Sequence, residues 1–213
     1  MSRSGNSVLE FAVLGLLHDS PMHGYELRKR LNALLGSLRA FSYGSLYPAL
    51  KGMLAAGWIC EGGEAAVGET PALTGRRGRI VYKLTPDGKE RLQEMLAEAG
   101  PSSWDDDGFG VHFAFFAKTD RDVRLRILEG RRSRLEERRE GVRGALARTR
   151  ERLDAYTLEL QQHGLDSVER EVRWLNELIA TERSSRSTTT GRRTPEHPSN
   201  RATVRPSRPR ENQ

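Results

Sequence analysis

Two stretches of the chain carry side chains suited to contacting phosphate groups and base edges. The first runs from residue 42 to residue 59, and its hydroxyl and basic groups are Ser42, Tyr43, Ser45, Tyr47 and Lys51. The second is Gly75-Arg76-Arg77-Gly78-Arg79, which places Arg76, Arg77 and Arg79 among glycines. Such side chains donate hydrogen bonds to phosphate oxygens and base edges. We therefore expect both stretches to contact double-stranded DNA.

Catalytic and metal-binding patterns are not recognisable in the sequence. The five histidines, at positions 18, 23, 112, 163 and 197, have no short metal-ligand spacing with Cys, Asp or Glu. No glycine loop for phosphate and no nucleophile elbow occurs. We expect no enzyme, no metal and no cofactor.

The composition of the chain indicates the cell compartment in which the protein is expected. The chain has 213 residues and one cysteine, Cys60, which allows no internal disulfide and fits a reducing cytoplasm. No apolar run of 18 residues and no secretion signal is present, so we expect a cytoplasmic protein that does not span a membrane. Most of the net charge of +6 comes from residues 184–213, which hold seven arginines and two glutamates.

The first stretch has the pattern of an amphipathic helix with an unusual outer face. Leu46, Leu50 and Met53 fall on one side, whereas the other side carries small residues and the single basic residue Lys51. A helix whose outer side chains are small can bring its backbone close to another surface, and the DNA major groove admits a helix. An ordinary amphipathic helix that ends at Gly57 is the alternative interpretation.

The elements around this helix predict a winged helix-turn-helix over residues 1–99. Two helices precede it, one over residues 8–17 and one opening at Met22 with a leucine stripe that runs to Leu38, each marked by apolar residues at helical spacing. Two short strands follow, over residues 58–61 and 79–84, with the arginine-rich loop between them. Thr85-Pro86-Asp87 then has the pattern of a helix start.

The second half predicts a linker over residues 100–108, a helical domain over residues 109–183 and a disordered basic tail over residues 184–213. Heptad-like spacing predicts a long helix, with its seam residues at Leu128, Leu135, Val142, Tyr156, Leu146, Leu153 and Leu160. Gly164 is expected to end it, and a shorter antiparallel helix is expected from about residue 167. The expected fold class is therefore mainly α, with this helix pair forming a dimerisation domain.

Five aromatic residues in this half are candidates for a dimer core or for a small-molecule pocket at the dimer interface. They are Phe109, Phe113, Phe115, Phe116 and Trp174. Apolar and aromatic side chains line both kinds of site, so the sequence leaves the two interpretations open.

Three segments resemble the PadR family of bacterial transcriptional regulators. They are FAVLGLLHDSPMHGYELRKRL, GSLYPALKGMLAAGWI and RIVYKLTPDGKERL, within residues 8–97. The resemblance implies a winged helix followed by a dimerising helical region. It also implies a repressor that in several members is released from DNA by a phenolic or drug-like molecule. The loop over residues 62–78 is longer than the family pattern.

The expected function is that of a sequence-specific transcriptional regulator. A homodimeric repressor would bind a palindromic operator and could be released by a small aromatic or drug-like effector. The alternative is a protein-interaction module, in which the winged helix is a scaffold and the charged C-terminal helices bind a partner protein.

Overall fold

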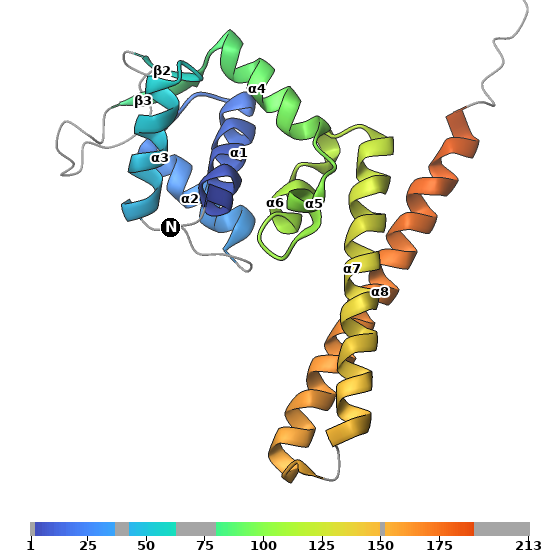
Figure 1. Cartoon of the computed structure of the whole chain (residues 1–213). Helices are drawn as coiled ribbons and strands as arrows, with labels where there is room; N and C mark the ends of the chain where they lie inside the picture. The colour runs from blue at the N-terminus through green and yellow to red at the C-terminus, as the bar shows by residue number, and fades with distance from the viewer. Residues whose placement is uncertain (1–2, 37–42, 63–79, 150–151, 190–213) are drawn as a thin grey trace, which may run out of the picture.

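The computed structural model describes residues 3–36, 43–62, 80–149 and 152–189. A compact N-terminal unit holds α1 (Arg3–Asp19), α2 (Gly24–Leu35), α3 (Tyr43–Ala55), α4 (Pro86–Ala97) and a small sheet. Two long helices, α7 (Arg121–Thr149) and α8 (Ala155–Thr189), project from this unit as a paired rod (Figure 1). The short helices α5 (Pro101–Trp104) and α6 (Phe109–Ala114) lie between the two parts. This mainly helical architecture confirms the predicted fold class.

The sheet has three antiparallel strands in the order β1-β3-β2. Strands β2 (Ile59–Gly62) and β3 (Val81–Leu84) pair with Ile59 opposite Leu84 and Gly62 opposite Val81. Both strands were predicted, and residues 63–79 between them lie outside the described residues. Strand β1 (Met22–His23), which pairs with β3, was not predicted because two residues are too few to show an alternating pattern.

The core of the N-terminal unit surrounds α1. Every residue from Phe11 to Leu17 except Gly15 is among the buried apolar residues, as expected for a helix that is apolar nearly all round. Helix α1 contacts α2, α3, α4, α6 and strand β3. The helix begins at Arg3, earlier than the predicted start at residue 8.

The junction between α3, the wing and α4 is fixed by two glycines and a threonine. Gly57 has a φ of +76° and ends α3, with the Trp58 N–H donating to the Met53 carbonyl at 3.0 Å. The Thr85 hydroxyl donates to the Gly57 carbonyl at 2.6 Å and accepts from the Gly88 N–H at 3.0 Å. Gly88 lies so close to β2 that a Cβ there would be 1.9 Å from the Trp58 carbonyl oxygen.

The segment predicted as a linker, residues 100–108, contains α5. Ser103 is fully buried and its hydroxyl donates to the Glu98 carbonyl at 3.1 Å. Trp104 packs against the apolar core between α7 and α8. These contacts hold the segment against both neighbouring parts.

The long helix pair differs from the prediction in where it turns. The turn lies between Thr149 and Ala155, and α8 continues through Gly164, so the predicted helix end at Gly164 is wrong. Asp154 stabilises the start of α8 because its carboxylate accepts from the Tyr156 and Thr157 N–H groups, each at 3.0 Å. A glycine inside a helix costs only about 1 kcal/mol, which the packing of a long helix offsets. Helix α8 runs past residue 184, where the tail was predicted to begin, and residues 190–213 are outside the described part.

The N-terminal unit meets the rest of the chain through a joint between α1 and α6. The Phe11 ring lies 5.3 Å from the Phe115 ring and 4.7 Å from the His112 ring. His112 is 7% exposed, and burial lowers the pKa of its imidazole to about 4. The joint is therefore packed around a neutral histidine.

We expect Gly88→Ala to lower the free energy of unfolding by about 1–3 kcal/mol, because the added methyl group would collide with the Trp58 carbonyl. Gly141→Ala is the matched control, since Gly141 lies in α7 with open space around it. That control should raise stability by about 0.5–1 kcal/mol through helix propensity. Thermal and urea unfolding measure both changes. Equal effects of the two substitutions would contradict the close approach.

We expect His112 to make stability depend on pH. The unfolded chain binds a proton near pH 6.5 and the folded chain only near pH 4. Stability contributed by the neutral ring is therefore complete above pH 6.5 and is lost as the pH falls toward 4. Between pH 7.5 and 5 the loss should be roughly 2 kcal/mol.

The measurement is urea unfolding of the wild type and His112→Phe at both pH values. The difference between their pH dependences isolates His112, because the other titrating groups are shared. Parallel profiles would show that His112 is protonated equally in both states.

Candidate nucleic-acid interface

Helix α3 buries one side and exposes the other, as its pattern predicts. Leu46, Leu50 and Met53 are at most 1% exposed. The outward residues are Gly44, Pro48, Lys51, Gly52 and Ala55. Four of these five are small or compact, so the side chains next to Lys51 protrude little and the backbone of α3 can approach a DNA groove closely.

The predicted contact residues on α3 fall into three groups. Lys51 is exposed, whereas Ser45 and Tyr47 are half-buried. Tyr47 packs against the core, and its hydroxyl would lie 3.4 Å from a Cβ placed at Gly24. Tyr43 is the first residue of α3, and Ser42 lies outside the described residues. Tyr47 therefore supports the helix with its buried part, and its exposed part can contact a ligand.

The wing lies beside α3 and forms a groove of about 360 Å³ with it. The lining residues are Tyr47, Leu50, Lys51, Leu54, Glu61, Ile80 and Tyr82. Burial, together with the charge of Glu61 and the neighbouring Tyr47, raises the pKa of Tyr82. Tyr82 therefore stays a neutral hydroxyl in this groove.

The wing arginines Arg76, Arg77 and Arg79 lie outside the described residues. One exposed cation of the wing, Lys83 on β3, was missed by the sequence analysis. In a regular strand Val81 and Lys83 point to the same face, so the burial of Val81 gave no indication that Lys83 would be exposed. Tyr82, between them, is also buried, so the simple alternation expected of a two-faced strand breaks down here.

The aromatic candidates divide between two places. Phe109, Phe113, Phe116 and Trp174 form one cluster, with ring centroids 4.9 to 6.2 Å apart in the contacting pairs. Phe115 faces the opposite way and packs against Phe11 in the N-terminal core. The expectation that all five share one site is therefore wrong for Phe115, because successive residues near the end of α6 point to different sides of it.

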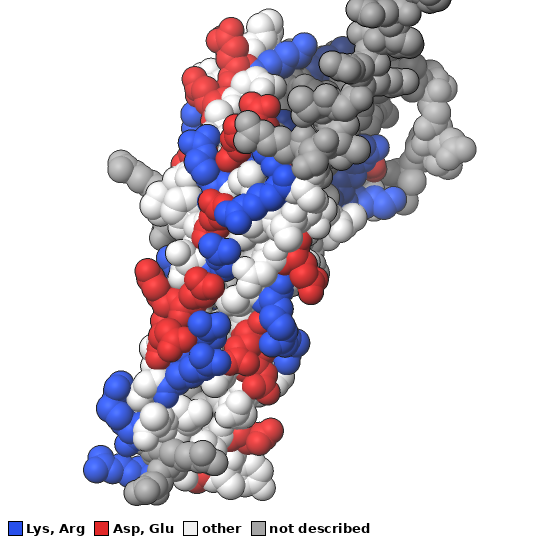
Figure 2. Space-filling view, turned by 90° about the vertical axis from the view of Figure 1, so that its right-hand side faces the viewer, with Lys and Arg blue, Asp and Glu red and all other residues white. Residues whose placement is uncertain are grey.

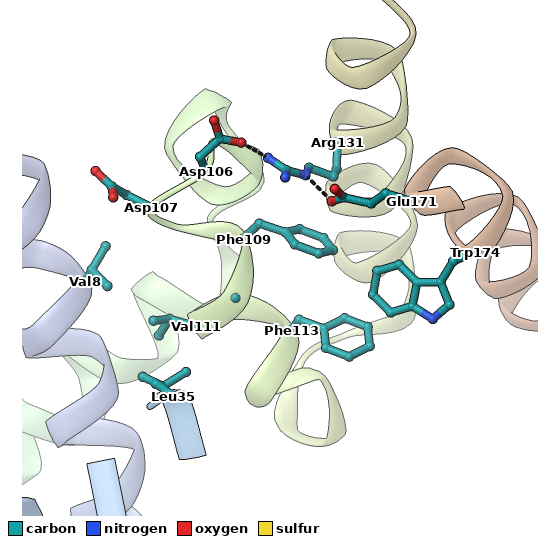
Figure 3. Close-up of a pocket in the computed structure, with 11 residues that line it drawn as sticks. Val8, Leu35, Asp106, Asp107, Phe109, Val111, Phe113, Arg131, Glu171 and Trp174 are labelled. Atoms are coloured by element: carbon teal, nitrogen blue, oxygen red, sulfur yellow. Dashed lines mark hydrogen bonds and ion pairs between the residues drawn. The ribbon is translucent and has the colours of Figure 1, made fainter. Parts of the chain in front are cut away.

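A pocket of about 630 Å³ opens beside this cluster (Figure 3). It is lined by Val8, Leu35, Asp106, Asp107, Phe109, Gly110, Val111, Phe113, Arg131, Glu171 and Trp174. These residues come from α1, α2, the α5–α6 connection, α6, α7 and α8. The pocket therefore lies between the N-terminal unit and the long helix pair within one chain.

Arg131 organises the polar side of the pocket. Its guanidinium donates to Asp106 at 2.5 Å and to Glu171 at 2.9 Å, and it is 8% exposed. The hydrogen bond from Arg131 lowers the pKa of Asp106, which stays ionised. These contacts tie the α5–α6 connection to both long helices.

The surface of α7 and α8 carries both charge signs along its length (Figure 2). Arg124 is one anchor, with hydrogen bonds to the Glu182 carboxylate at 2.8 and 3.0 Å. Two large apolar side chains near the turn are exposed, Tyr156 at 89% and Leu160 at 67%. In the described part of the chain, these are the most exposed large apolar side chains.

The described residues show neither a metal-binding cluster nor a membrane-spanning helix. No group of three or more His, Cys, Asp or Glu side chains there is arranged to hold a metal ion. None of the described helices is apolar over a length that would cross a bilayer. Cys60, the single cysteine, is exposed on β2.

Comparison with known proteins gives matches of three kinds. Residues 13–94 match the model of the transcriptional regulator PadR-like family. The negative transcriptional regulator PadR of Bacillus subtilis (strain 168) is 28% identical over 94 residues, which are 44% of this chain and 48% of that protein. The chain thus spans about half the length of this curated relative.

Matches among solved structures include Bacillus subtilis PadR in complex with operator DNA, with a TM-score of 0.39 and 19% identity. The alignment covers 82% of this chain and 99% of that one. Bacillus subtilis PadR in complex with p-coumaric acid has a TM-score of 0.37 and 20% identity, over 82% and 98% of the two chains.

The family match covers α2, α3, the three strands, the C-terminal part of α1 and most of α4, which are parts of the winged unit. Residues 13–94 of this chain are thus similar to the transcriptional regulator PadR-like family.

Proposed function

We propose that the chain is a sequence-specific DNA-binding regulator that acts as a homodimeric repressor. The observation that carries this proposal is the low, exposed side of α3 with Lys51 beside the wing groove. Helix α3 would enter the major groove, where base edges carry a distinct pattern of donors and acceptors. The wing arginines and Lys83 would lie along the phosphate backbone.

The repressor role is supported by the name of the Bacillus subtilis relative, a negative transcriptional regulator. We assign DNA binding to residues 1–99, joined through residues 100–108 to a dimerisation domain over residues 109–183. A two-fold dimer pairs with a palindromic operator whose half-sites lie about one helical turn, or a multiple of it, apart. We propose no catalytic activity for the chain.

A small-molecule effector belongs to the same proposal. The pocket between the N-terminal unit and the long helices is the candidate site, and its aromatic lining suits a small aromatic or drug-like compound. The proposed effector site lies within one chain, whereas the sequence left open a dimer core and a small-molecule pocket at the dimer interface.

The second candidate function is a protein-interaction module. Tyr156 and Leu160 favour it, because exposed large apolar side chains are typical of protein contact surfaces. A dimer would use the same residues, so the two candidates differ in whether DNA is bound at all.

We expect removal of the proposed DNA contacts to weaken binding and to flatten its salt dependence. The variant replaces Lys51, Arg76, Arg77 and Arg79 with Ala. Each lost phosphate contact should reduce the slope of log affinity against log salt by about 1, because fewer counterions are released. Fluorescence anisotropy with a duplex from the promoter of the protein's own gene measures affinity at several salt concentrations, with a scrambled duplex beside it.

The matched control removes four exposed arginines from the long helices instead, Arg126, Arg134, Arg170 and Arg173. It loses the same charge and should keep both the affinity and the slope. Unchanged promoter binding by the first variant would remove the proposed docking mode. Equal, weak binding of both duplexes by the wild type would favour the interaction module.

We expect Tyr156→Glu with Leu160→Glu to shift the protein from dimer to monomer. Charge at these positions would have to be desolvated in an interface, which is strongly unfavourable without a partner charge. Sedimentation equilibrium measures the mass, and circular dichroism checks that the helices persist. Glu159→Gln, at an exposed position between the two, is the control and should stay dimeric. A dimer of unchanged affinity in the double variant would place the interface elsewhere on the chain.

A further inference from the structure

The groove between α3 and the wing carries a carboxylate as well as a cation. Strand β2 lies beside α3 and is in contact with it (Figure 1). Glu61 on β2 lines the same groove as Lys51 on α3. Phosphate groups repel a carboxylate, so Glu61 is not suited to binding the DNA backbone. Its position beside Lys51 indicates a different contact.

The orientation of Glu61 follows from the pairing of β2 with β3. Glu61 lies directly opposite Tyr82 in the antiparallel register, and Tyr82 also lines the groove. Directly opposed residues project their side chains to the same face of a sheet. Burial is the main cause of the raised pKa of Tyr82, and the nearby charge of Glu61 is the next. The carboxylate therefore lies on the groove side of the wing.

Both charges of the groove are available to a ligand. Lys51 and Glu61 are exposed, and no described residue forms an ion pair with either of them. Lys83 is opposite Cys60, and its Nζ would lie 3.0 Å from a Cβ placed at Gly62. Because successive residues of a strand alternate between faces, Gly62 and Glu61 project to opposite sides. Lys51 and Glu61 are therefore separate charges in one groove.

A separated cation and anion match the major-groove edge of a G·C base pair. Guanine presents two acceptors, N7 and O6, and cytosine presents the donor N4–H₂ beside them. A lysine is suited to the guanine half of this edge and a glutamate to the cytosine half. An A·T pair has its donor on the purine between two acceptors, and a methyl group on the pyrimidine. Its edge therefore does not divide into an accepting half and a donating half.

The outer side of α3 offers few other polar groups near this groove. Gly52 and Ala55, which are exposed around Lys51, have no polar side-chain atoms. Discrimination between base pairs at the C-terminal part of α3 therefore depends on Lys51 and on groups that the wing supplies. Among the described wing residues that line the groove, Glu61 is the charged one.

From these observations we propose that Glu61 is a specificity-determining residue, which accepts a hydrogen bond from a cytosine amino group while Lys51 binds the guanine of the same base pair. This inference rests on the proposed function and adds to it one G·C pair that each half-site must contain. Glu61 contributes discrimination more than affinity, because its charge also meets the phosphates of any duplex.

Selection of binding sites from random duplexes with the full-length protein tests the base assignment. The wild type should enrich a motif with one fixed G·C pair in each half-site. Glu61→Gln should move the preference at that pair toward A·T, because a carboxamide pairs with adenine N6 and N7. Lys51→Ala should weaken the preference at the same pair. Glu137→Gln removes the same charge at an exposed position on α7, outside the groove, and should keep the wild-type motif.

Fluorescence anisotropy then measures discrimination between the selected duplex and one with this G·C pair replaced by A·T. The wild type and Glu137→Gln should prefer the G·C duplex by about 30-fold, and Glu61→Gln by about threefold or less. If Glu61 only repels phosphates, Glu61→Gln will raise the affinity for both duplexes equally and keep the preference. That result, or an unchanged motif, would overturn the role of Glu61 while leaving the proposed function intact. If the wild type enriches no motif, the proposed function itself fails, and this inference fails with it.

Discussion

The burial of α1 on every side is the constraint on which the rest of the structure depends. This helix contacts α2, α3, α4 and β3 within the N-terminal unit and α6 beyond it. Its apolar surface, removed from water, contributes the main driving force for assembling the unit. Because Phe11 also packs against Phe115, the element that supports α3 is the one that joins the unit to the rest of the chain. A displacement of α6 relative to α1 would therefore also shift α3, which packs against α1.

Charge has a different role, which is to set geometry between elements distant in the sequence. Arg131 holds Asp106 and Glu171, and Arg124 holds Glu182, so two arginines of α7 attach α8 and the α5–α6 connection to the same helix. A half-buried ion pair adds little net stability, but removing only one of its two partners is destabilising because the other charge is left unpaired. The aromatic pocket thus has a defined polar side.

Much of the N-terminal fold could be predicted because its signals are local. The leucines of α2 and the apolar side of α3 recur at helical spacing, Gly57 ends a helix, and Thr85-Pro86 begins one. In the C-terminal half, Leu128 and Leu135 were expected on a helix seam and are buried against α8. The turn between α7 and α8 was predicted at Gly164 and lies before Ala155. A glycine ends a helix only where packing does not offset its unfavourable helix propensity. In the sequence, Asp154 indicates the start of a helix less clearly than Gly164 indicates an end.

By itself, the sequence determined the helical character of the chain, the winged unit and the outward position of Lys51, since these follow from periodicity and from the conformations that Gly and Pro allow. Only the tertiary structure decided which aromatic residues meet. Phe115 turns to the N-terminal core while Phe109 and Phe113 turn to Trp174, and residues more than 60 positions apart in the sequence carry no periodic signal of their contact. The same holds for Arg131, whose two partners lie 25 and 40 residues away. The charge of the pocket depends on how these distant side chains are brought together, and packing alone decides that.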